Sequence, residues 1–203
     1  MAAQPVPAAP PEEPPPAGAL VSGESLAARE QGRVCISVEV PAADSLAACR
    51  EALRLGLRGE RAAAIRLALA QKLADALDWE GAVAVYGELV HDRPGDAAAW
   101  LRLGQAQLLG VGLPAQALVS LETAARLAPG DADAACLLGQ AYNAVGRQPE
   151  AIRELERAQL LDAGVLERRP GAREALEAAR RGEAWPGAYQ PTQNGPSPKS
   201  QST

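Results

Sequence analysis

The sequence predicts an all-α fold, a right-handed α-α solenoid of about three helical hairpins. The first observation is a repeat: Leu69-Ala70-Gln71 returns as Leu103-Gly104-Gln105 and again as Leu138-Gly139-Gln140, so the glutamines lie 34 and 35 residues apart. The second is a small residue at a fixed place downstream in each copy, namely Ala82, Ala117 and Ala151. A period near 34 is typical of stacked hairpins, because a single hairpin cannot bury its apolar face alone.

This pattern divides the chain into five parts. Residues 1–24 are a Pro- and Ala-rich tail, expected to be disordered because it cannot form a packed core. Residues 25–59 hold an extended segment and the single helix of a leading half-repeat, and residues 60–165 hold the three repeats. Residues 166–184 supply a capping helix with a polar outer face, which such arrays need for solubility. Residues 185–203, rich in Pro, Gly, Gln and Ser, form a second disordered tail.

The extended segment is predicted from residues 34–40, where apolar Val34, Ile36, Val38 and Val40 alternate with other residues. Such alternation is typical of a strand, which is unusual beside a helical array. Two interpretations stay open. Either the segment lays its valine face over the open end of the solenoid, or it pairs as a strand with another chain.

The helices of the three repeats are predicted from apolar periodicity and from capping residues. Asp96 is placed to cap the first helix of the middle repeat. The extra residue behind the 35-residue spacing is assigned to the turn at residues 110–112, and Gly146 to a position of positive φ. The expected helix pairs are 60–77 with 79–91, 96–109 with 114–127, and 131–145 with 148–161.

The repeated residues resemble those of the tetratricopeptide repeat (TPR) family over roughly half of the chain. In the first copy Ala70 stands where Gly is usual and Leu73 where Tyr is usual. The resemblance implies that the first helix of each hairpin lines a concave groove that binds a protein or peptide. It is carried by Trp100, Leu103, Gly104, Ala117 and Pro129 in the middle copy, and by Leu138, Gly139, Tyr142, Ala151 and Ala158 in the third.

Residues three or four apart on these first helices should share the groove-facing stripe. A glutamine amide both donates and accepts hydrogen bonds, so a row of three could hold a peptide backbone without charge. The simpler alternative is that Gln is a good helix former at an exposed position. The cationic set with which the carboxylate-clamp members of the family grip a chain terminus is matched here only by Arg102. The expected groove residues are Leu67, Gln71, Asp75, Leu101, Arg102, Gln105, Leu108, Gln140 and Asn143.

The function expected from this arrangement is that of a non-catalytic adaptor or scaffold that binds a protein or peptide partner in the groove. One alternative is a structural or assembly subunit, self-associating or held through the segment 34–40 and the convex face. Another is an accessory domain of an enzyme. No catalytic set can be assembled around His91, the single histidine. No cofactor and no metal site are predicted, because a lone histidine without a close cysteine pair cannot supply a usual ligand set.

Charge and cysteine content bound the partners and the compartment. A net charge of -5 argues against a nucleic-acid-binding surface, and no apolar run is long enough to span a bilayer. Without a recognisable signal segment the default location is the cytoplasm, or the periplasm or exterior if a signal was removed. Cys35 and Cys49 could pair as a disulfide in an oxidising compartment. Alternatively these two and Cys136 are all small buried apolar residues.

Overall fold

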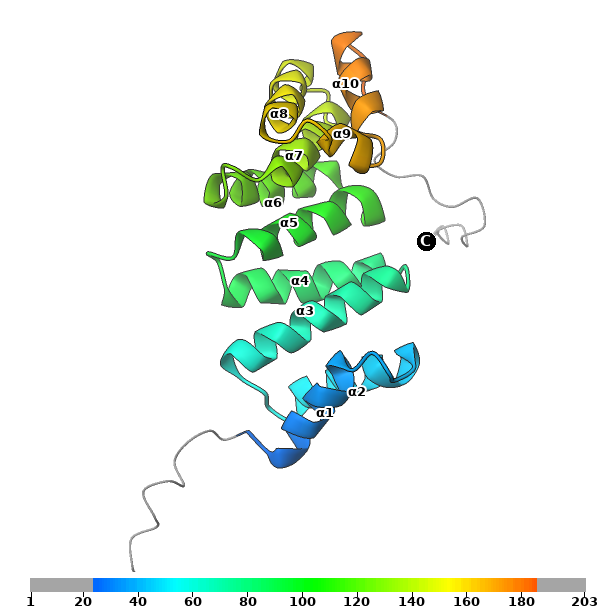
Figure 1. Ribbon diagram of the computed structural model, residues 1–203, viewed down its shortest axis with the longest axis vertical. Coiled ribbons are helices and arrows are strands. Elements are labelled where there is room, and N and C mark those ends of the chain that lie inside the picture. The colour runs from blue at the N-terminus through cyan, green and yellow to red at the C-terminus, as the bar shows by residue number, and fades with distance from the viewer. Residues whose placement is uncertain (1–23, 186–203) are drawn as a thin grey trace, which may run out of the picture.

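The computed structural model describes residues 24–185, and within that range every regular element is a helix. The helices stack in chain order along one elongated array, from α1 (blue) at one end to α10 (orange) at the other (Figure 1). The prediction of an all-α solenoid is therefore confirmed. The helices are α1 (Leu26–Ile36), α2 (Ala42–Arg54), α3 (Gly59–Asp75), α4 (Trp79–Asp92), α5 (Ala97–Gln105), the π-helical segment η1 (Ala106–Val111), α6 (Pro114–Leu127), α7 (Ala132–Ala144), α8 (Gln148–Leu161), α9 (Val165–Arg168) and α10 (Ala172–Arg180).

The N-terminal end, residues 25–59, is a complete hairpin of α1 and α2, and the predicted strand at 34–40 is wrong. The start of that segment is the last turn of α1, and the rest is an irregular connection. Helical spacing prevails because it buries Ala28, Gly32 and Cys35 along one stripe. Val38, expected on the buried face of the strand, is 98% exposed. The array is therefore longer by one helix than the sequence indicated.

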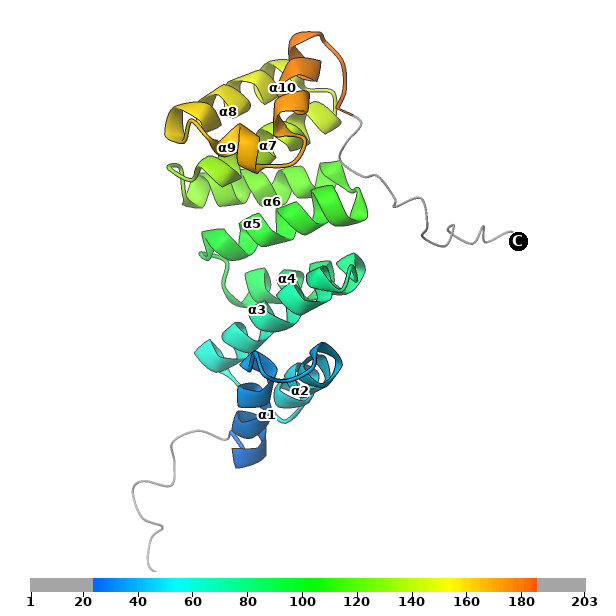
Figure 2. The same cartoon turned by 45° about the vertical axis from the view of Figure 1, so that its right-hand side comes forward.

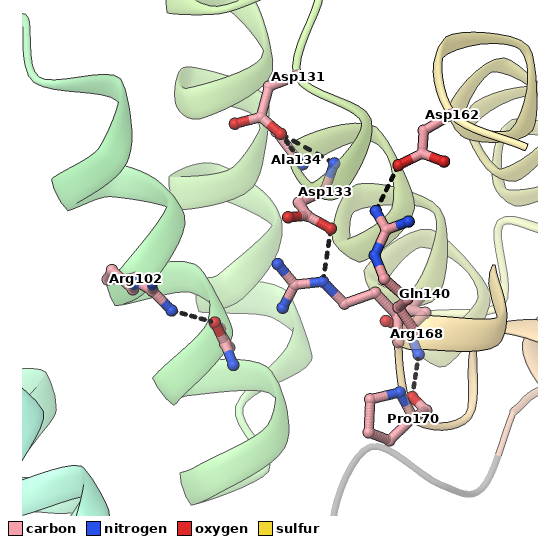
Figure 3. Close-up of polar contacts among 10 residues, drawn as sticks. Arg102, Asp131, Asp133, Ala134, Gln140, Asp162, Arg168 and Pro170 are labelled. Atoms are coloured by element: carbon pink, nitrogen blue, oxygen red, sulfur yellow. Dashed lines mark hydrogen bonds and ion pairs between the residues drawn. The ribbon is translucent and has the colours of Figure 1, made fainter. Parts of the chain in front are cut away.

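The three predicted hairpins are formed by α3 with α4, α5 and η1 with α6, and α7 with α8, and α6 and α8 have the predicted bounds. An aspartate precedes a helix of each hairpin and accepts a hydrogen bond from a free backbone N–H of the first turn. The donor–acceptor distances are 3.0 Å from Gly81 N to Asp78, 3.1 Å from Ala99 N to Asp96 and 3.1 Å from Ala134 N to Asp131. The contact between Asp131 and Ala134 is visible in Figure 3.

Glycines at equivalent places in two of the repeats permit close approach of the helices. A Cβ added to Gly104 would lie 2.5 Å from Cγ of Leu121 on the opposite helix of the hairpin. One added to Gly139 would lie 2.6 Å from Cγ of Leu155 and 3.1 Å from the backbone oxygen of Ala151. Both leucines are fully buried, so in each of these two hairpins a leucine packs in the space that a Cβ on the glycine would occupy.

The extra residue of the middle repeat lies inside a helix and not in the turn at residues 110–112. The first helix of that hairpin passes from α5 into η1, and only Gly112 and Leu113 then separate it from α6. The other two hairpins have three-residue connections, at residues 76–78 and 145–147. A π-helical turn absorbs one residue without lengthening the loop, so the stacking of the hairpins is kept.

The C-terminal end of the described chain packs on the last hairpin. The apolar face predicted for the capping helix is buried, with Ala172, Ala175, Leu176 and Ala179 at most 5% exposed. Figures 1 and 2 show that α10 runs across α7 and α8 and not parallel to them. The short helix α9, which the sequence did not predict, connects α8 to this crossing helix. The cap therefore covers part of the face that α7 would otherwise expose.

Candidate functional site

A pocket of about 320 Å³ lies where α3, α4 and α5 meet. We call it the α3–α5 pocket. Four of the predicted groove residues line it, and they come from two different hairpins. The complete lining is Gln71, Ala74, Asp75, Trp79, Tyr86, Arg102, Gln105 and Ala106.

Helical spacing explains how the predicted residues reach this place. Gln71 and Asp75 lie four residues apart on α3, so they share a face, and Arg102 and Gln105 lie three apart on α5. The Arg102 guanidinium donates a hydrogen bond of 3.4 Å to the side-chain oxygen of Gln105 (Figure 3). The structure therefore brings these four side chains together at one pocket.

Two aromatic lining residues, Trp79 and Tyr86, were missed as site residues. Trp79 begins α4 directly after its capping aspartate, and Tyr86 lies two turns further along. The ring of Trp79 also packs against η1, because a Cβ added to Gly110 would lie 2.4 Å from Cδ2 of that ring. The predicted groove residues were taken from the first helix of each hairpin, so these two residues of α4 were not among them.

The pocket carries charges of both signs. Asp75 and Arg102 line it, and neither forms an ion pair with any residue that the structure describes. Both act on Tyr86: burial raises the pKa of its hydroxyl, the charge of Arg102 lowers it and the charge of Asp75 raises it. The Tyr86 side chain is only 2% exposed, and within residues 24–185 its hydroxyl has no hydrogen-bond partner.

Leu67, Leu101 and Leu108 were expected in the groove and lie outside the pocket. Leu67 is 37% exposed on α3 and Leu101 is half-buried on α5. The prediction that Leu108 lies in the groove is wrong, because this side chain is fully buried in the core. Leu108 belongs to η1. The π-helical turn there changes which side chains face the groove, and Gln107 points toward α6. The side-chain oxygen of Gln107 accepts a hydrogen bond of 2.7 Å from the Ser120 hydroxyl there.

The prediction that Gln140 and Asn143 line the groove is also wrong, because both are completely buried beneath the cap. The Gln140 amide donates to the Pro170 carbonyl at 2.9 Å (Figure 3), and the Asn143 amide donates to the Ala175 carbonyl at 2.7 Å. The expected row of three glutamines is therefore open only at its first two positions. The apolar stripe of the capping helix was predicted, but the sequence did not indicate that this helix would cover Gln140 and Asn143.

The cap is also held by charge. Arg169 forms an ion pair of 2.7 Å with Asp133 at the start of α7, and Arg168 pairs with Asp162 (Figure 3). The hydrogen bond from Arg169 lowers the pKa of the Asp133 carboxyl, although partial burial acts against it. These contacts fix the segment between α8 and α10 against the last hairpin.

The cysteines lie apart from the pocket. Cys35 at the end of α1 and Cys49 in α2 are joined as a disulfide, with a Cα–Cα distance of 4.7 Å. Cys136 is a free, fully buried thiol in α7, and burial raises its pKa to about 12. In the described part of the chain no three metal-ligating side chains gather at one place. No helix in that part has the length and apolar character required to cross a bilayer.

No protein-family model and no curated protein matches the sequence. Among solved structures, MamA is 19% identical over 77% of this chain and 82% of its own, with a TM-score of 0.67. YrrB, described as a TPR protein with an unusual peptide-binding site, is 20% identical over 75% of this chain and 73% of its own, with a TM-score of 0.59. The TPR2B domain of yeast Sti1, solved in a complex with pHsp70, is 21% identical over 59% of this chain and 96% of its own, with a TM-score of 0.53. The chain therefore has the fold of TPR proteins, as the resemblance implied.

Proposed function

We propose that the chain is a non-catalytic adaptor that binds a peptide segment of a partner protein, and that the α3–α5 pocket is the contact site. The observation that carries the proposal is that Gln71, Asp75, Arg102 and Gln105 line one pocket between neighbouring hairpins. Amide and charged side chains at such a place can hold both the backbone and one side chain of a peptide. The peptide-related descriptions of YrrB and the Sti1 domain agree with this use of the fold.

The test is an affinity purification from the native organism with the full chain and two variants as bait. Gln105→Glu places a carboxylate beside Arg102 in the pocket. Gln116→Glu makes the same chemical change at an exposed position of α6, outside the pocket. We expect proteins captured by the wild type and by Gln116→Glu to be lost from Gln105→Glu, with equal thermal stability of both variants. Equal capture by the two variants would refute a binding role for the pocket.

A second candidate is a structural or assembly subunit that associates through its N-terminal end. The strand on which this idea first rested is absent, but Ile36 is 59% and Val38, two residues further along, is 98% exposed. Exposed apolar side chains favour association with another surface. Light scattering at high concentration checks this: self-association predicts a mass above that of one chain, lowered by Ile36→Lys, and a monomer under all conditions excludes it.

A further inference from the structure

We propose that the α3–α5 pocket selects the side-chain amide of an asparagine or glutamine in the bound peptide. This inference rests on the proposed function, because it names the chemistry that the same pocket recognises. Its basis is a pocket whose lining includes Asp75, Arg102 and Tyr86, and the Tyr86 hydroxyl has no hydrogen-bond partner among residues 24–185.

The two charges decide against a charged ligand group. A carboxylate of the peptide would be attracted by Arg102 and repelled by Asp75, and an ammonium group would meet the reverse. A neutral amide gains from both, because its NH₂ can donate to Asp75 while its oxygen accepts from Arg102. The pocket therefore differs from a site that grips a carboxylate with several cations, since its lining offers one cation and one anion.

The tyrosine decides against an apolar ligand group. Tyr86 lines the pocket and is only 2% exposed, and its hydroxyl is the polar group of its side chain. An aliphatic side chain would remove water from this hydroxyl and from two charges without replacing any hydrogen bond, which is unfavourable. A site built to form hydrogen bonds rejects ligands that lack the matching groups.

The pocket also has the size and the rigid walls that one side chain requires. Its volume of about 320 Å³ is at the small end of the range for ligand sites, so it holds a side chain and a short stretch of backbone. Trp79 forms one wall and is fixed by contact with Gly110 of η1. Gln71 and Gln105 line the pocket from α3 and α5, and their NH₂ groups can donate to the peptide backbone.

The experiment uses four pools of fluorescent twelve-residue peptides with blocked ends. Each pool has one fixed central residue, Gln, Glu, Lys or Leu, and random Ala, Ser and Gly elsewhere. Fluorescence polarisation with the purified full chain gives the affinity of each pool. We expect the Gln pool to bind about tenfold more tightly than the other three, the size of change that one or two hydrogen bonds supply.

Two charge-removing variants then test the pocket itself. Asp75→Asn should shift the preference toward the Glu pool, and Arg102→Gln toward the Lys pool, each by about tenfold relative to the Gln pool. Asp44→Asn and Arg126→Gln are matched controls, because both residues are exposed and outside the pocket. Neither control should change the order of the pools.

The outcomes separate the two proposals. Equal binding of all pools, weakened throughout by Gln105→Glu, leaves the adaptor function standing and overturns amide selection. Preference of the wild type for the Glu pool, or an unchanged order in Asp75→Asn, also overturns it. If no pool binds the wild type at any concentration, the peptide-binding function of the pocket falls as well.

Discussion

Two glycines of the array should respond differently to the same added methyl group. In an exposed helix interior, Gly→Ala stabilises by up to about 1 kcal/mol, since alanine has the higher helix propensity. Overfilling a packed interior costs about 1–3 kcal/mol. At Gly104 the new Cβ would meet Cγ and Cδ2 of Leu121 at 2.5 and 2.7 Å, with the nearest backbone atom at 3.4 Å. At Gly139 it would meet Leu155 Cγ at 2.6 Å and two backbone atoms at 3.1 Å.

The balance at each site follows from what can move. A leucine side chain can shift to another rotamer, so Gly104→Ala should lower the free energy of unfolding by about 1 kcal/mol or less. The backbone of α8 cannot retreat from Gly139 without opening the hairpin, so Gly139→Ala should lower it by about 2 kcal/mol. Gly87 in α4 is the matched control. A Cβ there meets no atom within 4 Å, so Gly87→Ala should raise stability by about 0.5–1 kcal/mol.

Urea unfolding of the wild type and the three variants, followed by circular dichroism and tryptophan fluorescence, gives the four midpoints. The expected order of stability is Gly87→Ala, wild type, Gly104→Ala and Gly139→Ala. If Gly139→Ala were as stable as the wild type, α7 and α8 could not lie as close together as described. If Gly87→Ala were the least stable, the propensity argument itself would be wrong.

Three further outcomes are expected. Arg169→Gln should lower the free energy of unfolding by up to about 1 kcal/mol at neutral pH, because its partner is partly exposed. The native pKa of Asp133 lies below its unfolded value. The stabilisation by the ion pair is therefore present above the unfolded pKa and disappears as the pH falls through the native pKa. If Arg169→Gln lowered the free energy of unfolding equally at pH 2, the ion pair would be contradicted. Thiol titration in denaturant should find one reactive cysteine before reduction and three after it, and three before reduction would exclude the bond between Cys35 and Cys49. Reduction of this bond should lower the free energy of unfolding by about 3 kcal/mol. In the folded protein Cys136 should not react, and rapid labelling would show that α7 is not as buried as described.

The central hairpins could be predicted because their signals are local and repeated. A capping aspartate, an apolar stripe and a small residue (Gly or Ala) at a fixed place act together in each copy, so an error in one is corrected by the others. The same reasoning located Gln71, Asp75, Arg102 and Gln105, which share faces of regular helices. Regular spacing therefore identifies which side chains share a helix face, but not which of them a later segment covers.

The errors arose where one segment could satisfy two periodicities, or where a distant segment intervened. Val34 and Ile36 alternate as in a strand, but Cys35 between them is the residue that becomes buried, in contact with α2. Gln140 has the same local sequence context as Gln71, yet it is covered by a segment thirty residues further along. Neither outcome is encoded in a window of one or two turns, because each depends on tertiary contact.

One residue of η1, Gly110, affects the shape of the pocket although it does not line it. Gly110 does not line the pocket, but its missing side chain is what allows the indole of Trp79 to stand where it does. Any larger residue at this position would push that wall inward or outward. A change of the residue at position 110 would therefore alter the shape of the α3–α5 pocket while every residue that lines it stays the same.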